Sequence, residues 1–400
     1  MREYGRAHSK LSNNLETAKD NELVFTNGDL IIKKANGKNI SLYNKLVEDC
    51  VDKEIIGNVP AIYGFTINFN EPNPYDAITY IENNTQFKPL SNDDDGVIHT
   101  NSWSDRIIRH ELGIRPCLFK DGKVICYLDS NDYTKDIYGN NVENIRNADV
   151  MIEFKRMWCR YVLGSNCITF KIANYEVDET YTTIFKEKYM YISAYNVVVS
   201  NGIPASRPGN ILSLNENNNI IKSKLKSGYS LLSYDKYMYI LSLSWLLTKS
   251  FNPLDLIGKN ISRITGILDD KGLFYNGNIG NKFLGFENFW QYYTYIDGIA
   301  TSKNSLYTVD NAGIKNVLLQ DIFKDGWISG IGYRKGVIYP SSYNGSSSTH
   351  VCSYVTNKNN EDLNFSNIYF GGLEEDPEHT GVFSLFMKEP KYVGYRLCYN

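Results

Sequence analysis

The sequence lacks a hydrophobic run long enough to cross a membrane. The longest apolar stretches, such as Tyr237–Leu247, fall well short of the ~20 consecutive apolar residues that a membrane-spanning helix needs. The chain starts with the polar residues Met-Arg-Glu-Tyr-Gly-Arg, and no apolar segment typical of a signal peptide follows them. We therefore expect a protein that is made in a cytoplasm and does not insert into a membrane.

The sequence also has few residues of the kinds that bind metals. Its five histidines are scattered, and no two of them have the spacing of a His-Glu-x-x-His motif. Its seven cysteines form no Cys-x-x-Cys pair, and their odd number in a long chain indicates reduced thiols rather than a disulfide framework. We expect no structural zinc site and no cofactor.

An excess of charge of one sign is missing as well. The 42 basic and 45 acidic side chains leave a net charge of −3, whereas a nucleic-acid-binding domain shows a basic patch or stripe. The glycine-rich stretch Gly326–Gly332 lacks the Gly-Lys-Ser/Thr of a phosphate-binding loop, and no Gly-x-Ser-x-Gly motif occurs. We interpret the acidic stretches Ser91–Gly96 and Glu374–Asp376 as solvated turns, not as a calcium loop or a glycosidase pair. We expect no nucleic-acid partner and no enzymatic activity.

Aromatic residues, by contrast, are abundant. They make up 14% of the sequence, and 31 of them are tyrosines. The ring and hydroxyl group of tyrosine suit recognition surfaces, but tyrosine is also common in half-buried strands. Composition alone favours the strands.

The length of 400 residues predicts two or three domains. Apolar runs around the turn signal Asn27-Gly28 predict a small hairpin module in residues 1–57. The clearest hairpin signal is Asp121-Gly122, which stands between the apolar runs 116–120 and 123–128. We expect a β-rich domain at 58–175. The pattern of apolar residues in this domain and in the segment after it predicts further strands at 63–69, 77–81, 149–154, 158–162, 167–172 and 189–195.

Residues 176–400 form the third predicted region. Its one strong helix signal is Tyr234–Phe251, where apolar residues recur on one broad face, and Asn252-Pro253 ends it. The stretch Gly285–Gly298 has five aromatic residues in seven positions. We expect Phe289 and Trp290 to lie in the core, whereas Tyr292, Tyr293 and Tyr295 either join them or line a surface.

Arg396 stands among apolar residues near the end of the chain. A buried arginine needs a carboxylate or several carbonyl oxygens. We predict that Arg396 forms a structural ion pair.

These last segments carry a resemblance to a known family. Gly394-Tyr395-Arg396-Leu397-Cys398 resembles the Gly-Phe-Arg strand that ends C-type-lectin-like domains of the formylglycine-generating-enzyme type. Gly285–Trp290, which runs on to Ile296-Asp297-Gly298, resembles the Gly-x-x-x-Asn-x-Trp-Glu stretch of that fold, and the helix around Trp245 takes the place of its main helix. Further segments are similar to phage tail proteins that carry this domain: 62–65, 77–80, 116–127, 131–135, 149–154, 340–347, 370–372 and 381–385.

The resemblance covers residues 60–400. It implies an α+β fold, with a mainly β N-terminal part followed by a C-type-lectin-like, receptor-binding domain (176–400) that has one main helix and many loops. It also implies a virion tail-fibre or tail-appendage protein, made in the host cytoplasm and trimeric, that binds a host cell-surface structure. Residues 1–57 then attach it to other virion tail proteins. Copper-binding enzymes of this type use a cysteine pair, whereas here Cys352 stands alone in its region and Cys398 lies on the terminal strand, so we expect no copper site.

The expected ligand is a wall polysaccharide or another surface glycan. Sugars present flat apolar faces ringed by hydroxyl groups, which suit aromatic rings surrounded by polar side chains. The loops 338–351 and 369–381 supply this mixture. We predict that the ligand-binding residues are Tyr333, Tyr339, Tyr343, Asn344, Ser346 and Tyr369.

Two alternatives remain open. A structural collar or baseplate component would contact only other virion proteins, and its tyrosines would then form an assembly interface. An enzyme would act either as an oxidase through Cys352 or as a depolymerase.

Overall fold

The computed structural model describes residues 60–93, 97–142, 147–309, 313, 315–357, 365–372, 375–387 and 390–400, together with the backbone of three strands nearer the N-terminus. Those strands form an antiparallel sheet and are β1 (Leu23–Thr26), β2 (Asp29–Lys33) and β3 (Asn39–Ser41). The hairpin predicted in the first module is thereby confirmed, and the remainder of residues 1–57 lies outside the described residues.

The protein is β-rich: strands account for 39% of the structure and helices for 11%. Two large sheets contain most of the strands predicted from the sequence. The first is six-stranded, in the order β17 (Tyr229–Leu231), β32 (Leu397–Tyr399), β14 (Tyr189–Ser193), β10 (Asp149–Lys155), β8 (Ile114–Lys120) and β9 (Lys123–Tyr127). The second is five-stranded, in the order β13 (Thr182–Thr183), β11 (Trp158–Leu163), β12 (Cys167–Ala173), β4 (Ile62–Asn68) and β5 (Ile78–Glu82).

The hairpin predicted at Asp121-Gly122 is confirmed by the antiparallel pair β8–β9. Both turn residues have a positive φ, 50° for Asp121 and 79° for Gly122, which matches the right-handed twist of the flanking strands. A Cβ atom at Gly122 would lie 2.5 Å from the hydroxyl oxygen of Tyr399. The turn therefore needs glycine both for its backbone conformation and for the packing of the last strand.

A further six-stranded sheet lies in the C-terminal third, in the order β25 (Gly326–Trp327), β28 (Tyr354–Thr356), β30 (Leu385–Phe386), β29 (Tyr369–Phe370), β21 (Tyr293–Tyr295) and β31 (Val393–Gly394). Its strands are only two or three residues long. Smaller sheets consist of β18 (Tyr275–Gly277), β19 (Gly280–Phe283) and β20 (Phe286–Glu287); β22 (Ile299–Ser302), β23 (Ser305–Val309) and β24 (Lys315–Leu319); β26 (Gly330–Arg334) and β27 (Val337–Ser342); β15 (Val198–Ser200) and β16 (Ile203–Ala205); and β6 (Ser91–Asn92) and β7 (Ile98–His99).

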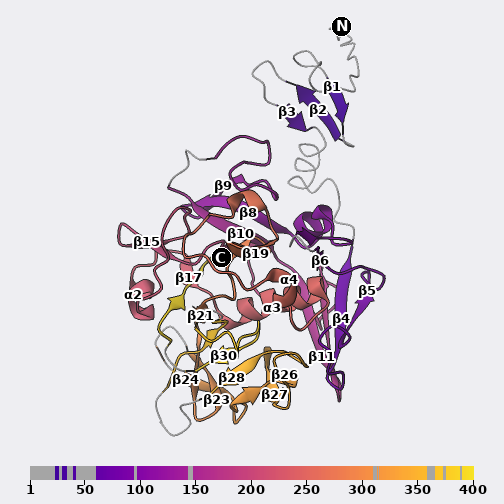
Figure 1. The fold of residues 1–400 in the computed structure, drawn as a ribbon, viewed down its shortest axis with the longest axis vertical. Helices are drawn as coiled ribbons and strands as arrows, with labels where there is room; N and C mark the ends of the chain where they lie inside the picture. The colour runs from indigo at the N-terminus through magenta and orange to yellow at the C-terminus, as the bar shows by residue number, and fades with distance from the viewer. Residues whose placement is uncertain are drawn as a thin grey trace.

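The main helix, α3 (Tyr234–Thr248), lies at the centre of the molecule (Figure 1). Although its apolar residues recur on one broad face of the sequence pattern, every residue of α3 except Asp235 is buried. Its polar side chains are compatible with this position since Ser242 and Thr248 donate hydrogen bonds to the carbonyl oxygens four residues earlier. The other helical segments in the described residues are a π-helical turn (Ile107–Glu111), α2 (Asn218–Ser223), α4 (Leu254–Ile257) and a 3₁₀ turn (Asp269–Lys271).

Tyrosine hydroxyl groups connect α3 to the sheets around it. Tyr80 of β5 donates to the carbonyl oxygen of Leu246 at 2.6 Å, and Tyr161 of β11 shares a 2.9 Å hydrogen bond with Ser242. On the other side, the rings of Tyr237 and Phe370 of β29 have their centroids 4.1 Å apart. These three tyrosines therefore fill space between α3 and the strands.

The predicted boundary between residues 175 and 176 runs through a shared core. One cluster of buried apolar side chains extends from Ala61 to Cys398. In addition, the C-terminal strand β32 pairs with both β14 and β17, in the sheet that also contains β8 and β10. The two predicted segments thus contribute strands to the same sheet. In the described part of the chain, no helix combines the length and the apolar character needed to cross a bilayer.

Candidate functional site

Three half-exposed aromatic side chains meet at the edge of the C-terminal sheet. Trp327 of β25 stands directly opposite Tyr354 of β28, with ring centroids 5.3 Å apart and planes at 80°. His379, from the loop 369–381, packs on both rings, 4.5 Å from that of Tyr354 and 6.1 Å from that of Trp327. All three retain some solvent exposure. We name Trp327, Tyr354 and His379 the aromatic platform.

A single hydroxyl group fixes the histidine to the strand. The side chain of Ser384 donates to the carbonyl oxygen of His379 at 2.9 Å. It accepts hydrogen bonds from the amides of Tyr354, at 2.9 Å, and Gly381, at 2.7 Å. Because Ser384 is buried, these bonds hold the end of the loop against β28.

Two carboxylates flank the platform. Asp325 accepts a 2.6 Å hydrogen bond from the hydroxyl group of Tyr354 and a 2.9 Å bond from the amide of Asn357. Asp376 pairs with Nδ1 of His379 at 2.9 Å. The hydrogen bond to Asp325, followed by burial, raises the pKa of Tyr354 to about 12, so its phenol remains protonated near neutral pH. The arrangement offers aromatic faces with hydrogen-bond acceptors at their rim.

Three of the predicted residues lie in the loop that adjoins this platform. The amide of Gly345 in the loop donates to the carbonyl oxygen of Trp327 at 3.2 Å. Asn344 is exposed, and its amide donates to Ser329 at 3.0 Å. Tyr343 is half-buried and donates to the carbonyl oxygen of Ile322 at 2.7 Å, whereas Ser346 shares a 2.8 Å hydrogen bond with Thr349.

The other three predicted residues lie elsewhere. Tyr333 and Tyr339 are half-buried on the hairpin β26–β27, where Tyr333 stacks on Tyr161 with ring centroids 4.7 Å apart. Tyr369 is only 3% exposed in β29, and it borders a separate cavity of about 400 Å³ together with Tyr395. The structure therefore distributes the predicted ligand-binding residues over three places.

The platform residues themselves were absent from the predicted set. Trp327 lies in the glycine-rich stretch that the sequence excluded as a phosphate-binding loop, and Tyr354 follows it by 27 positions. Nothing in the local pattern indicates that these two residues pair. The only signal was the position of His379, one of five histidines, inside a loop already predicted to bind a ligand.

Two further expectations from the sequence concern residues of the core. Of the alternatives for Tyr292, Tyr293 and Tyr295, the core is correct, because none is more than 3% exposed. The ion pair predicted for Arg396 is wrong as stated, because its guanidinium donates to the main-chain carbonyl oxygens of Ser193, Ala194 and Glu287.

The two C-terminal cysteines are both buried. Burial raises the pKa of Cys352 to about 12 and that of Cys398 to about 11, which disfavours the thiolate needed for copper binding or nucleophilic attack. Within the ranges that the structure describes, no three His, Cys, Asp or Glu side chains are grouped so that they could hold a metal ion.

Comparisons with known proteins add no assignment. No protein-family model matches this sequence, and a search of curated proteins found no match.

Proposed function

We propose that this protein is a virion tail-fibre or tail-appendage protein that binds a host cell-surface glycan, and that the glycan lies on the aromatic platform. The observation that carries the binding role is the cross-strand pair Trp327–Tyr354, covered by His379 and flanked by Asp325 and Asp376. The virion role rests on the resemblance of residues 60–400 to phage tail proteins. The C-type-lectin-like character of residues 176–400 is part of the same proposal.

The chemistry of the platform suits a sugar ring. The C–H groups on one face of a pyranose pack against tryptophan and tyrosine rings, while its hydroxyl groups point outward. Asp325 and Asp376 stand where they can accept hydrogen bonds from such hydroxyl groups, and each is already oriented by a donor from the platform. The neighbouring loop adds the exposed side chain of Asn344.

A shallow aromatic platform binds one sugar weakly. The proposed homotrimer, with several copies on each virion, would multiply such contacts, because linked sites raise the effective concentration of the ligand. Residues 1–57 would hold each copy on the particle through other tail proteins. Nothing in this proposal requires a catalytic step.

The test is binding of the full chain to an array of bacterial wall polysaccharides. The full chain is needed because β14, the partner of the C-terminal strand β32, also pairs with β10, which a fragment that begins at residue 176 would lack. We expect wild type to bind at least one polysaccharide and Trp327→Ala to lose most of the signal. Trp158→Ala is the matched control, since Trp158 is a half-buried tryptophan on a different sheet, and it should bind like wild type.

Other outcomes would contradict the proposal. Absence of binding to any wall polysaccharide or host cell, together with failed virion assembly when the protein is deleted, would support the structural collar or baseplate role. Equal losses in the two tryptophan variants would remove the platform from the binding site. New reducing ends in a polysaccharide incubated with the protein would indicate a depolymerase.

A further inference from the structure

A second concave site lies away from the platform, beside the first large sheet. It is a cavity of about 520 Å³ bordered by the end of β8, the loop that follows β9, the start of β10 and the segment 207–210. In Figure 1, β8 and β10 lie in the upper part of the molecule, whereas β28, which carries Tyr354, lies in the lower part. The two sites are therefore separate.

One part of the cavity wall is apolar. It consists of the side chains of Leu118, Val142, Ala148 and Val150. Three of them are buried and Val142 is half-buried, packed against the main core. Such a surface suits the C–H face of a small ring.

The rest of the wall carries two opposite charges, those of Arg207 and Asp269. The guanidinium of Arg207 makes one long hydrogen bond, 3.4 Å from Nη1 to Ser200. Its Nε is buried and has no acceptor among the described residues. Because a buried N–H group without an acceptor is unfavourable, Arg207 is suited to receive an anionic group from a ligand.

Asp269 is anchored by hydrogen bonds, and the ammonium group of the buried Lys282 interacts with its carboxylate. The carboxylate of Asp269 accepts a hydrogen bond from the hydroxyl group of Tyr195. Its main-chain carbonyl oxygen accepts a 2.7 Å hydrogen bond from the amide of Tyr133. Burial raises the pKa of Asp269. The hydrogen bonds hold Asp269 as a fixed partner for the hydroxyl groups of a ligand.

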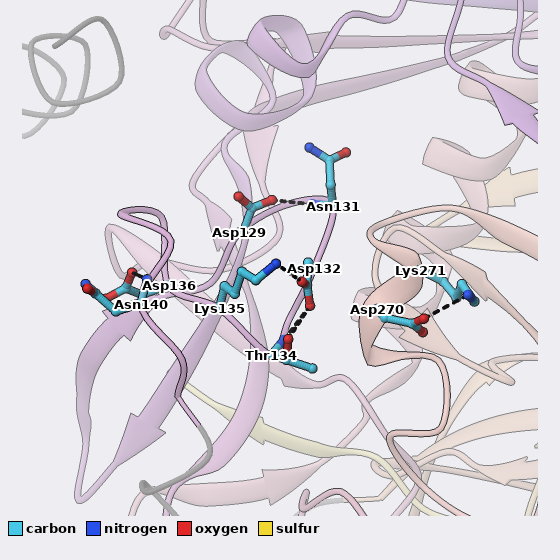
Figure 2. A network of polar contacts seen from close by, with 9 residues as sticks. All are labelled: Asp129, Asn131, Asp132, Thr134, Lys135, Asp136, Asn140, Asp270 and Lys271. Carbon is cyan, nitrogen blue, oxygen red and sulfur yellow. Dashed lines mark hydrogen bonds and ion pairs between the residues drawn. The ribbon is translucent and has the colours of Figure 1, made fainter. Parts of the chain in front are cut away.

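The loop that forms one side of the cavity is held in shape by its own side chains (Figure 2). Asp129 accepts a 2.7 Å hydrogen bond from the amide of Asn131, and Asp136 accepts a 2.8 Å hydrogen bond from the amide of Asn140. Between them, Asp132 accepts a 3.0 Å hydrogen bond from the amide of Thr134. Thr134 borders the cavity. These bonds keep this wall in place without a ligand.

We infer that this cavity binds a sugar acid, a pyranose with one carboxylate, through Arg207 on the carboxylate and Asp269 on the hydroxyl groups. A single carboxylate matches the planar fork of one arginine. A phosphate carries nearly two negative charges, whereas Arg207 is the one cationic side chain among the described residues that border the cavity. The apolar side chains of the cavity then take the face of the ring.

The test uses the full chain and glucuronate as the probe, with binding measured by saturation-transfer NMR and calorimetry. We expect glucuronate to bind at least about tenfold more tightly than glucose, which corresponds to a gain of one charge-assisted hydrogen-bonded pair. Arg207→Gln should weaken glucuronate binding by at least about tenfold for the same reason. Arg263→Gln is the matched control, an exposed arginine that packs on Tyr392 and does not border the cavity, and it should bind glucuronate like wild type.

Three results would overturn the inference. They are no binding of glucuronate at tens of millimolar, equal binding of glucose and glucuronate, or unchanged binding in a folded Arg207→Gln variant. Tighter binding of glucose 6-phosphate than of glucuronate would overturn the carboxylate assignment. Trp327→Ala should leave glucuronate binding unchanged, so that failure of the platform and failure of this cavity are distinguishable.

Discussion

The guanidinium of Arg396 donates a hydrogen bond to the main-chain carbonyl oxygen of Glu287, which joins the C-terminal segment to strand β20. The same guanidinium reaches the carbonyl oxygens of Ser193 and Ala194 at the end of β14, at 3.1 and 2.7 Å. Arg396 is fully buried, and its charge is thus stabilised by three carbonyl dipoles. The residue connects segments that are more than 100 positions apart in the sequence.

Replacing Arg396 with methionine should strongly destabilise the fold. The variant keeps the apolar stem but removes a donor from three buried carbonyl oxygens, of which, among the described residues, only that of Ala194 keeps another donor, the amide of Glu287. Leaving a buried acceptor without its donor typically costs about 1–3 kcal/mol. Urea unfolding followed by circular dichroism measures the loss. Arg334→Met, at an exposed position of β26, is the control and should stay within about 0.5 kcal/mol of wild type. Equal stability of the two variants would contradict this role for Arg396.

Removing the last four residues should prevent stable folding. These residues contain β32, which lies between β14 and β17 in its sheet, so their loss leaves both neighbours without a partner on one side. We expect a chain that ends at Arg396 to lose its cooperative thermal transition or to aggregate. A chain that lacks only Asn400, which is exposed, should melt like wild type. A normal thermal transition in the shorter chain would show that β32 is dispensable.

Glu287 should contribute stability at about pH 5 that is lost by about pH 8. Burial raises the pKa of this carboxyl group to about 7, above the value of about 4.3 in an unfolded chain. The folded protein therefore holds the proton more tightly, and the stabilisation present at low pH is lost as the pH rises through the folded pKa. Lys282 and Arg396 favour the charged form and Asp269 opposes it, but burial dominates.

Glu287→Gln isolates this contribution. Glutamine stays neutral and can still accept the hydrogen bond that Gly266 donates to the side chain. Between pH 5 and pH 8, wild type should lose on the order of 1–2 kcal/mol more than the variant. Urea unfolding of both proteins across this range gives the difference. Parallel pH profiles would mean that Glu287 ionises normally in the folded state.

Tyr354→Phe should weaken glycan binding at the proposed platform without unfolding it. The ring remains, but Asp325 loses the hydroxyl group that orients its carboxylate. We expect an affinity loss of about threefold to tenfold, the usual range for one hydrogen bond. The measurement is titration with the best polysaccharide from the array. Tyr75→Phe is the matched control because Tyr75 makes a similar 2.7 Å bond to Asp255, and not to Asp325 or Asp376. It should leave the affinity unchanged.

Local sequence signals were sufficient for many individual elements. Alternating apolar residues identified β4, and the Asp121-Gly122 turn identified the pair β8–β9. The extent of α3 was also predicted to within three residues. Its burial was not, because periodicity reports one apolar face and contains no information on how many sheets surround a helix.

The site depended on contacts that no local pattern encodes. Tyr343 and Asn344 were correctly placed in one loop. That loop gains its aromatic neighbours only when β25 pairs with β28 and His379 packs on both rings. Tyr369, chosen for the same composition, is buried in the adjacent strand β29. Composition along the chain cannot distinguish a tyrosine that faces solvent from one that faces the core.

The sequence by itself determined that this protein is rich in tyrosine and in β-strands and has one main helix. The strands and the helix could be predicted because turn signals and periodicities act over a few residues. Only the tertiary structure decided which tyrosines are core and which are surface, that Arg396 is stabilised by carbonyl groups, and that Trp327, Tyr354 and His379 meet. Such contacts are set by the pairing of short strands distant in sequence. Their register depends on the packing of the whole core and not on their own few residues.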